Sequence, residues 1–123
     1  MATKRIDTGD GRDALAAVAA AESAGEKPAR TAHATAVRYL LQLLVEKAPG
    51  NSVEVRVPPF GAAQVIQGPR HTRGTPPNVV EMEPSTWIAL ATGALAWEEA
   101  VAQGRISASG VRADLAAVLP VRP

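Results

Sequence analysis

The sequence contains no cysteine among its 123 residues. This absence excludes disulfides, thiolate zinc sites, iron–sulfur clusters and a cysteine nucleophile, and it fits a cytoplasmic protein. Histidine is almost as scarce: His33 and His71 lie far apart in the sequence, and neither belongs to a spacing that metal sites use. We therefore expect no metal, no cofactor and a cytoplasmic location.

The sequence also lacks an excess of charge of one sign and long apolar runs. Thirteen Lys and Arg against twelve Asp and Glu give a net charge of +1, so no overall field attracts nucleic acid or an anionic membrane. No stretch approaches the ~18 uninterrupted apolar residues of a membrane span, and residues 1–13 lack the apolar centre of a signal peptide. We expect no nucleic-acid partner and no membrane span, and any anion site must be local.

The residues that are present can build one folded domain. Hydrophobic residues make up 46% of the chain, and Val53, Val55 and Val57 alternate with charged residues as in a half-buried strand. Periodicity and Pro/Gly punctuation predict helices over residues 10–24, 31–47, 85–92, 97–103 and 112–119, and strands over 52–57, 62–67, 78–82 and 106–109. These elements predict an α/β (α+β) fold of two layers. We expect a single domain overall, with a tail and short Ala-rich helix over residues 1–28 preceding its main part, 29–123.

Four sequence pieces occur in an order typical of a known family. They are PPFGA at residues 58–62, GPRHTRGTPPN at 68–78, the two tryptophans Trp87 and Trp97, and SGVRADL before LP at 109–120. With these pieces the chain resembles the sterol carrier protein type 2 superfamily, and more narrowly its actinobacterial orthologue family. It is also similar to the C-terminal domain of mycothiol-dependent maleylpyruvate isomerases. The resemblance implies a mixed, mostly antiparallel sheet of four to five strands with helices on one face, and an apolar tunnel that can hold lipid.

The segment 68–78 is the most unusual in the chain. It places two guanidiniums, an imidazole, hydroxyls and an amide between prolines, a combination suited to a carboxylate or phosphate. The candidate ligand-binding residues in it are Arg70, His71, Arg73, Thr75 and Asn78. An alternative interpretation is a solvated hairpin loop whose arginines pair with nearby carboxylates such as Glu81 or Glu83. Both interpretations remain open.

Apolar side chains supply the other candidate site. Val57, Trp87 and Trp97 are placed either to line a ligand cavity or to fill the core. We predict that the protein is not an enzyme, because no nucleophile, acid–base pair or metal set occurs at a usable spacing.

Two functions remain in view. The first is a non-enzymatic binding domain of sterol-carrier type for an apolar or amphipathic small molecule, a lipid or acyl compound, with Arg70 and Arg73 accepting its acidic end. The alternative is an enzyme-associated or protein-interaction module with a protein partner, related to the thiol-dependent isomerases. A binding domain should enclose an apolar cavity of at least ~300 Å³, whereas an interaction module should have a filled core and an exposed apolar patch.

Overall fold

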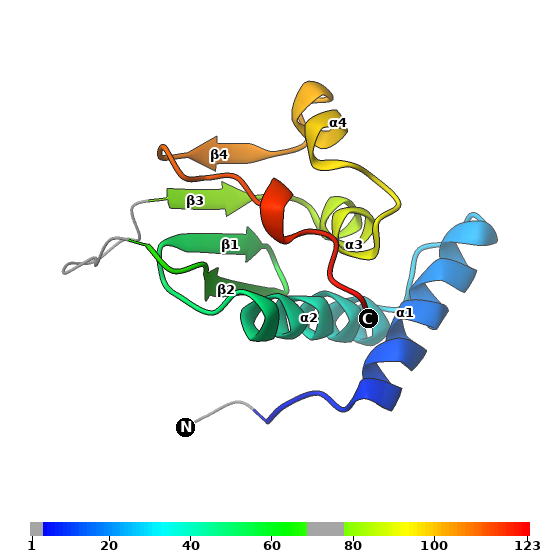
Figure 1. Cartoon of the computed structure of the whole chain (residues 1–123). Helices are drawn as coiled ribbons and strands as arrows, with labels where there is room; N and C mark the ends of the chain where they lie inside the picture. The colour runs from blue at the N-terminus through cyan, green and yellow to red at the C-terminus, as the bar shows by residue number, and fades with distance from the viewer. Residues whose placement is uncertain (1–3, 69–77) are drawn as a thin grey trace.

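The structure is a computed structural model that describes residues 4–68 and 78–123 (Figure 1). The helices are α1 (Thr8–Ser23), α2 (Arg30–Lys47), α3 (Pro84–Thr92), α4 (Trp97–Ala102) and the short 3₁₀ turn η1 (Ala116–Val118). The strands are β1 (Val53–Val57), β2 (Gly61–Val65), β3 (Asn78–Glu81) and β4 (Ser107–Ser109). The elements predicted before residue 110 are therefore present, with bounds shifted by a few residues at most.

The four strands form one mixed sheet in the order β2-β1-β3-β4. β1 pairs antiparallel with β2 and parallel with β3, and β3 pairs antiparallel with β4. Val55 thus lies between Ala63 and Val80. The predicted α+β fold with a mixed, mostly antiparallel sheet is confirmed.

The core lies between this sheet and the helices. The valines of β1 are fully buried at 0% exposure and pack with the apolar side of α2, notably Leu40 and Leu44, and with α3. On the opposite face of β1, Glu54 and Arg56 form an ion pair and stay partly exposed. The alternation in the sequence therefore separates a covered face from a wet face, which gives the two-layer sandwich (Figure 1).

α1 adds to the outside of the helical layer. It packs against α2, burying Ala14 and Val18 beside Ala36. Gly11 faces the ring of Tyr39 so closely that a Cβ at this position would lie 2.3 Å from the ring. The lack of a side chain at Gly11 lets the two helices approach at this point.

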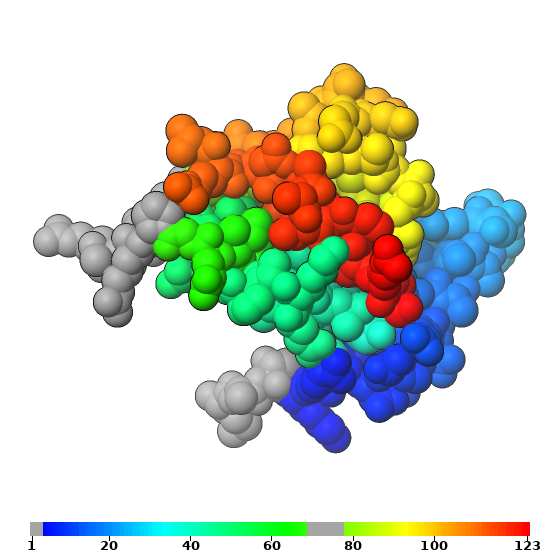
Figure 2. All heavy atoms as spheres, in the orientation of Figure 1, coloured from blue at the N-terminus to red at the C-terminus, as the bar shows by residue number. Residues whose placement is uncertain are grey.

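The C-terminal segment differs from its prediction. Instead of a helix over residues 112–119, the chain forms only η1, whose first residue donates its N–H to Asp114 Oδ1 at 2.7 Å. Leu119 precedes Pro120 and is extended, as a residue before proline prefers. Leu115 is fully buried and Val121 donates its backbone N–H to Ala91 O, so tertiary contacts override the local helical pattern. Figure 2 shows the red C-terminal residues lying between α2 and the yellow atoms of α3 and α4.

Backbone preferences of single residues set the ends of α3. Pro84 occupies the first turn of α3, and Gly93 ends it with φ 90°. α4 begins after Ala96, which makes no side-chain cap. Gly50 is required for a different reason, because a Cβ there would lie 2.1 Å from the carbonyl of Ile66.

Candidate functional site

Four of the predicted loop residues, Arg70, His71, Arg73 and Thr75, lie outside the described residues, so their anion site stays a prediction. The fifth, Asn78, is 2% exposed. Its Nδ2 donates to Ser52 O at 2.7 Å, and its Oδ1 accepts from Arg112 N at 2.8 Å. The Asn78 amide thus ties together the starts of β1 and β3 and the segment after β4.

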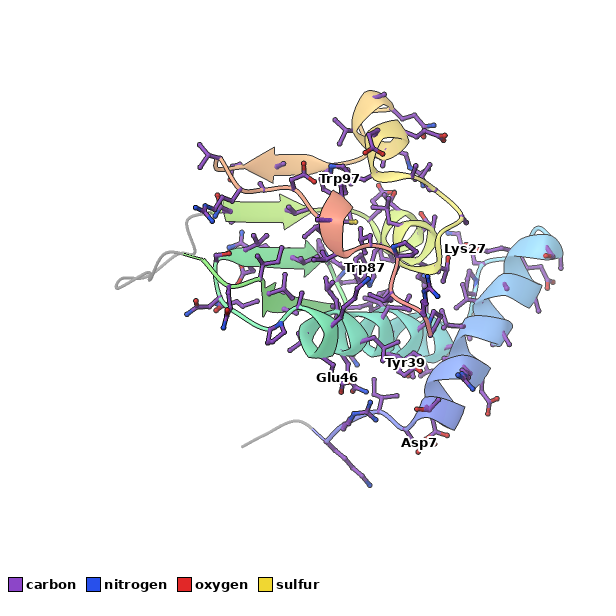
Figure 3. All side chains as sticks on the ribbon, viewed as in Figure 1. Asp7, Lys27, Tyr39, Glu46, Trp87 and Trp97 are labelled. Carbon is purple, nitrogen blue, oxygen red and sulfur yellow. The ribbon has the colours of Figure 1, made fainter. Side chains whose placement is uncertain are left out.

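The apolar candidates lie in two different environments. Val57 and Trp87 are fully buried in the core, and Trp87 Nε1 donates to the backbone oxygen of Val37 at 3.2 Å. Trp97 is 9% exposed and lines a small groove of about 280 Å³ with Leu90, Leu95 and Pro120. Figure 3 labels both tryptophans, which come from separate helices.

An enclosed apolar cavity would favour a binding domain, and a filled core with an exposed apolar patch would favour an interaction module. The groove beside Trp97 is open to solvent rather than enclosed, and Val57 and Trp87 fill the space between the layers. Within residues 4–68 and 78–123 the large apolar side chains that are exposed are Val101 and Val111, and they do not form a broad patch.

An amphipathic groove of about 470 Å³ lies where the N-terminal segment, α2 and β2 meet. We call it the α2–β2 groove. Its apolar lining is formed by Ile6, Leu41, Val45, Phe60 and Ala63. This lining combines a helix, the turn before β2 and the strand itself, so it exists only in the folded chain.

The polar side of the α2–β2 groove is cationic. Arg38 lies on the exposed side of α2, and its Nε donates to Phe60 O at 2.7 Å, which holds the guanidinium at the groove. In the described part of the chain no carboxylate pairs with Arg38 or with Lys4, the other unpaired cation of the lining. Their charge is therefore available to an anionic group.

Arg5 is the third cation of the groove and is engaged. Its Nε and Nη2 donate to Glu46 Oε2 and Oε1 at 2.7 and 3.0 Å. The hydrogen bond from Arg5 lowers the pKa of Glu46, and the same bond raises the pKa of Arg5. Both groups are exposed, so this pair positions the chain more than it stabilises the fold.

Phe60 also packs against the first turns of α2. The ring of His33 lies 5.3 Å from that of Phe60, and the guanidinium of Arg30 lies 5.3 Å above the same ring. His33 Nε2 is buried and has no hydrogen-bond partner among the described residues. These contacts make Phe60 a fixed part of the groove wall.

Sequence reasoning missed the α2–β2 groove. Arg38, Leu41, Gln42 and Val45 follow the spacing i, i+3, i+4, i+7, which places two polar and two apolar side chains on one helical face. That mixed stripe was a usable signal. No sequence signal indicated that the N-terminal segment would line the groove, because it does so through contacts with residues distant in the sequence.

The part of the chain that the structure describes holds no group of three or more His, Asp or Glu side chains placed to bind a metal ion. None of its helices is long and apolar enough to cross a membrane.

The sheet and its helical cover define a two-layer α+β sandwich with a surface groove. The model of a family described as bacterial SCP orthologues matches residues 29–121, well over half of the chain, so the protein belongs to this sterol carrier protein-like family. No curated protein matches the chain.

Proposed function

We propose that this sterol-carrier-like domain binds an amphipathic small molecule with an acidic head, a lipid or acyl compound, in the α2–β2 groove, and that it does so without catalysis. The observation that carries the proposal is the groove itself, where apolar walls adjoin the unpaired cation Arg38. Its volume of about 470 Å³ lies in the range of small-molecule sites. Family membership supports the same ligand class.

The two ends of such a ligand would be bound by different forces. Each methylene that leaves water against Leu41, Val45 and Phe60 contributes ~0.8 kcal/mol. A carboxylate would accept charge-assisted hydrogen bonds from the Arg38 guanidinium, which keeps its Nη groups when Nε is used by Phe60. Because the groove is open, we expect weak binding, with a dissociation constant of about 100 μM, as for one acyl chain at a bilayer.

The loop arginines Arg70 and Arg73 remain a second proposed acceptor for the acidic head. They supply the same chemistry as Arg38 but lie outside the described residues. The absence of cysteine favours the cytoplasm as the location of this binding activity. The alternative, an interaction module that serves an enzyme, stays a proposal without a specific surface to support it.

Calorimetric titration with dodecanoate and with dodecanol tests the proposal. Wild type should bind the acid more tightly than the alcohol, because only the acid carries the charge that Arg38 would contact. Arg38→Gln should weaken dodecanoate binding about tenfold, the loss of one charge-assisted contact, and leave dodecanol unchanged. Arg12→Gln, on the exposed side of α1, is the matched control.

Arg73→Gln separates the two acceptors. If Arg73→Gln binds dodecanoate more weakly than wild type and Arg38→Gln does not, the acidic head binds at the loop and not at Arg38. Wild-type protein that binds neither dodecanoate nor dodecanol would refute the proposed function.

A further inference from the structure

The N-terminal residues 4–6 run along α2 as a short extended segment before α1, and we call this segment the strap (Figure 3). The backbone N–H of Ile6 donates to Gln42 Oε1 at 2.8 Å, and Gln42 Nε2 donates back to Ile6 O at 2.9 Å. One turn further along α2, Glu46 points toward the strap and accepts two hydrogen bonds from Arg5. Side chains of a single helix thus hold the strap at two successive positions.

The strap separates two depressions of the surface. On one side it lines the α2–β2 groove, where Ile6 is an apolar wall. On its other side it lines a second groove of about 700 Å³ with Asp10 and Asp13 of α1 and Thr31 and Thr35 of α2. Residues 4–6 are the lining that the two grooves share. If the strap left α2, the α2–β2 groove would lose a wall and open toward this second groove, whose lining also includes Ala14, Ala17 and Ala32.

The forces on the strap permit such opening. Its hydrogen bonds join exposed or partly buried groups, which exchange readily with water. Behind it the chain is anchored, because Asp7 caps α1 by accepting from Gly9 N and α1 packs on α2. The strap therefore has a fixed end at α1 and a weakly held body over the groove. It also precedes the residues 29–121 that match the family.

We propose that the strap is a movable wall that retains the ligand of the α2–β2 groove, and that Gln42 is the positioning residue that holds it closed. This proposal rests on the proposed function, because it requires a ligand in that groove. The Gln42 side chain accepts a hydrogen bond from the backbone N–H of Ile6 and donates one to the backbone oxygen of Ile6, so it binds both polar atoms of that backbone. The ligand enters and leaves when this pair is broken.

Stopped-flow dissociation of 11-(dansylamino)undecanoic acid, displaced by excess dodecanoate, tests the strap directly. Gln42→Ala removes both hydrogen bonds and should raise the dissociation rate about tenfold, whereas Glu46→Gln, which keeps an acceptor for Arg5, should raise it about threefold. Gln103→Ala and Glu99→Gln make the same substitutions at exposed positions of the α4 region and should change nothing. Deletion of residues 1–6, with Gln42 intact, should match Gln42→Ala.

The outcomes separate the strap from the proposed function. If wild type binds the probe and both Gln42→Ala and the deletion dissociate within twofold of wild type, the strap does not retain the ligand, while the proposed function stands. If wild type binds no probe, the proposed function is wrong and the strap has no ligand to retain. In either case, amide hydrogen exchange at Ile6 should be faster in Gln42→Ala than in wild type, because the variant lacks the acceptor for the Ile6 N–H.

Discussion

Replacing Gly11 by alanine should destabilise the protein, although the same change usually stabilises a helix. In a helix interior, alanine is favoured over glycine by about 0.8–1.0 kcal/mol. At Gly11, however, the added Cβ would lie 2.3–2.5 Å from three atoms of the Tyr39 ring, distances at which something must shift. The ring is 1% exposed, so it has no open space into which to move.

The expected size follows from these opposing terms. Overpacking costs typically ~1–3 kcal/mol, and contacts this short belong at the upper end. Subtracting the helix-propensity gain leaves a net loss of about 2 kcal/mol in the free energy of unfolding. For a chain of 123 residues this corresponds to a decrease in melting temperature of roughly 8 °C.

A double-mutant cycle with Tyr39→Ala isolates the cause. Once the ring is gone, Gly11→Ala should show its intrinsic preference and stabilise by up to about 1 kcal/mol. Chemical denaturation of the four proteins, with the denaturant dependence checked for constancy, measures the coupling. If Gly11→Ala stabilises the protein that retains Tyr39, α1 does not pack on α2 as described.

Two further predictions concern the core and the strap. Trp87→Ala should lower the free energy of unfolding by ~3–5 kcal/mol. Trp97→Ala should lower it by less, because Trp97 borders an open groove while Trp87 is fully enclosed. An equal or larger loss for Trp97→Ala in denaturant titrations would contradict this packing. In the folded protein the hydrogen bond from Arg5 holds the pKa of Glu46 below its ordinary value of 4.5. The stabilising effect of the pair is therefore complete above pH 4.5 and is lost as the pH falls through the folded pKa. The Arg5 side-chain NH resonance should shift in that acidic range in wild type, and a Glu46→Gln variant that showed the same shift would refute the assignment.

The fold could be predicted where local signals and burial agree. Val53, Val55 and Val57 alternate in the sequence and in burial, and Pro84 and Gly93 delimit α3 as their backbone preferences require. The segment after Gly110 could not be predicted this way. Its apolar residues have helical spacing, but Leu115 and Val121 are each placed by contacts with elements distant in sequence. The spacing of apolar residues therefore identifies the side chains that are buried, but here the backbone conformation is determined by tertiary contacts.

The candidate site was even harder to predict from the sequence than the C-terminal segment, because it too depends on non-local contacts. From the sequence, Val57, Trp87 and Trp97 could either line a cavity or fill the core, because large apolar residues suit both; the structure shows Val57 and Trp87 at 0% exposure in the core. The α2–β2 groove arises where Arg38 of α2, Phe60 before β2 and Ile6 of the strap meet, and these three residues come from separate parts of the chain. Only the face of α2 that carries Arg38 and Gln42 was visible in the sequence. The wall that would retain a ligand depends on a backbone hydrogen-bond pair at Ile6, and backbone groups carry no sequence signal because every residue but proline has the same ones.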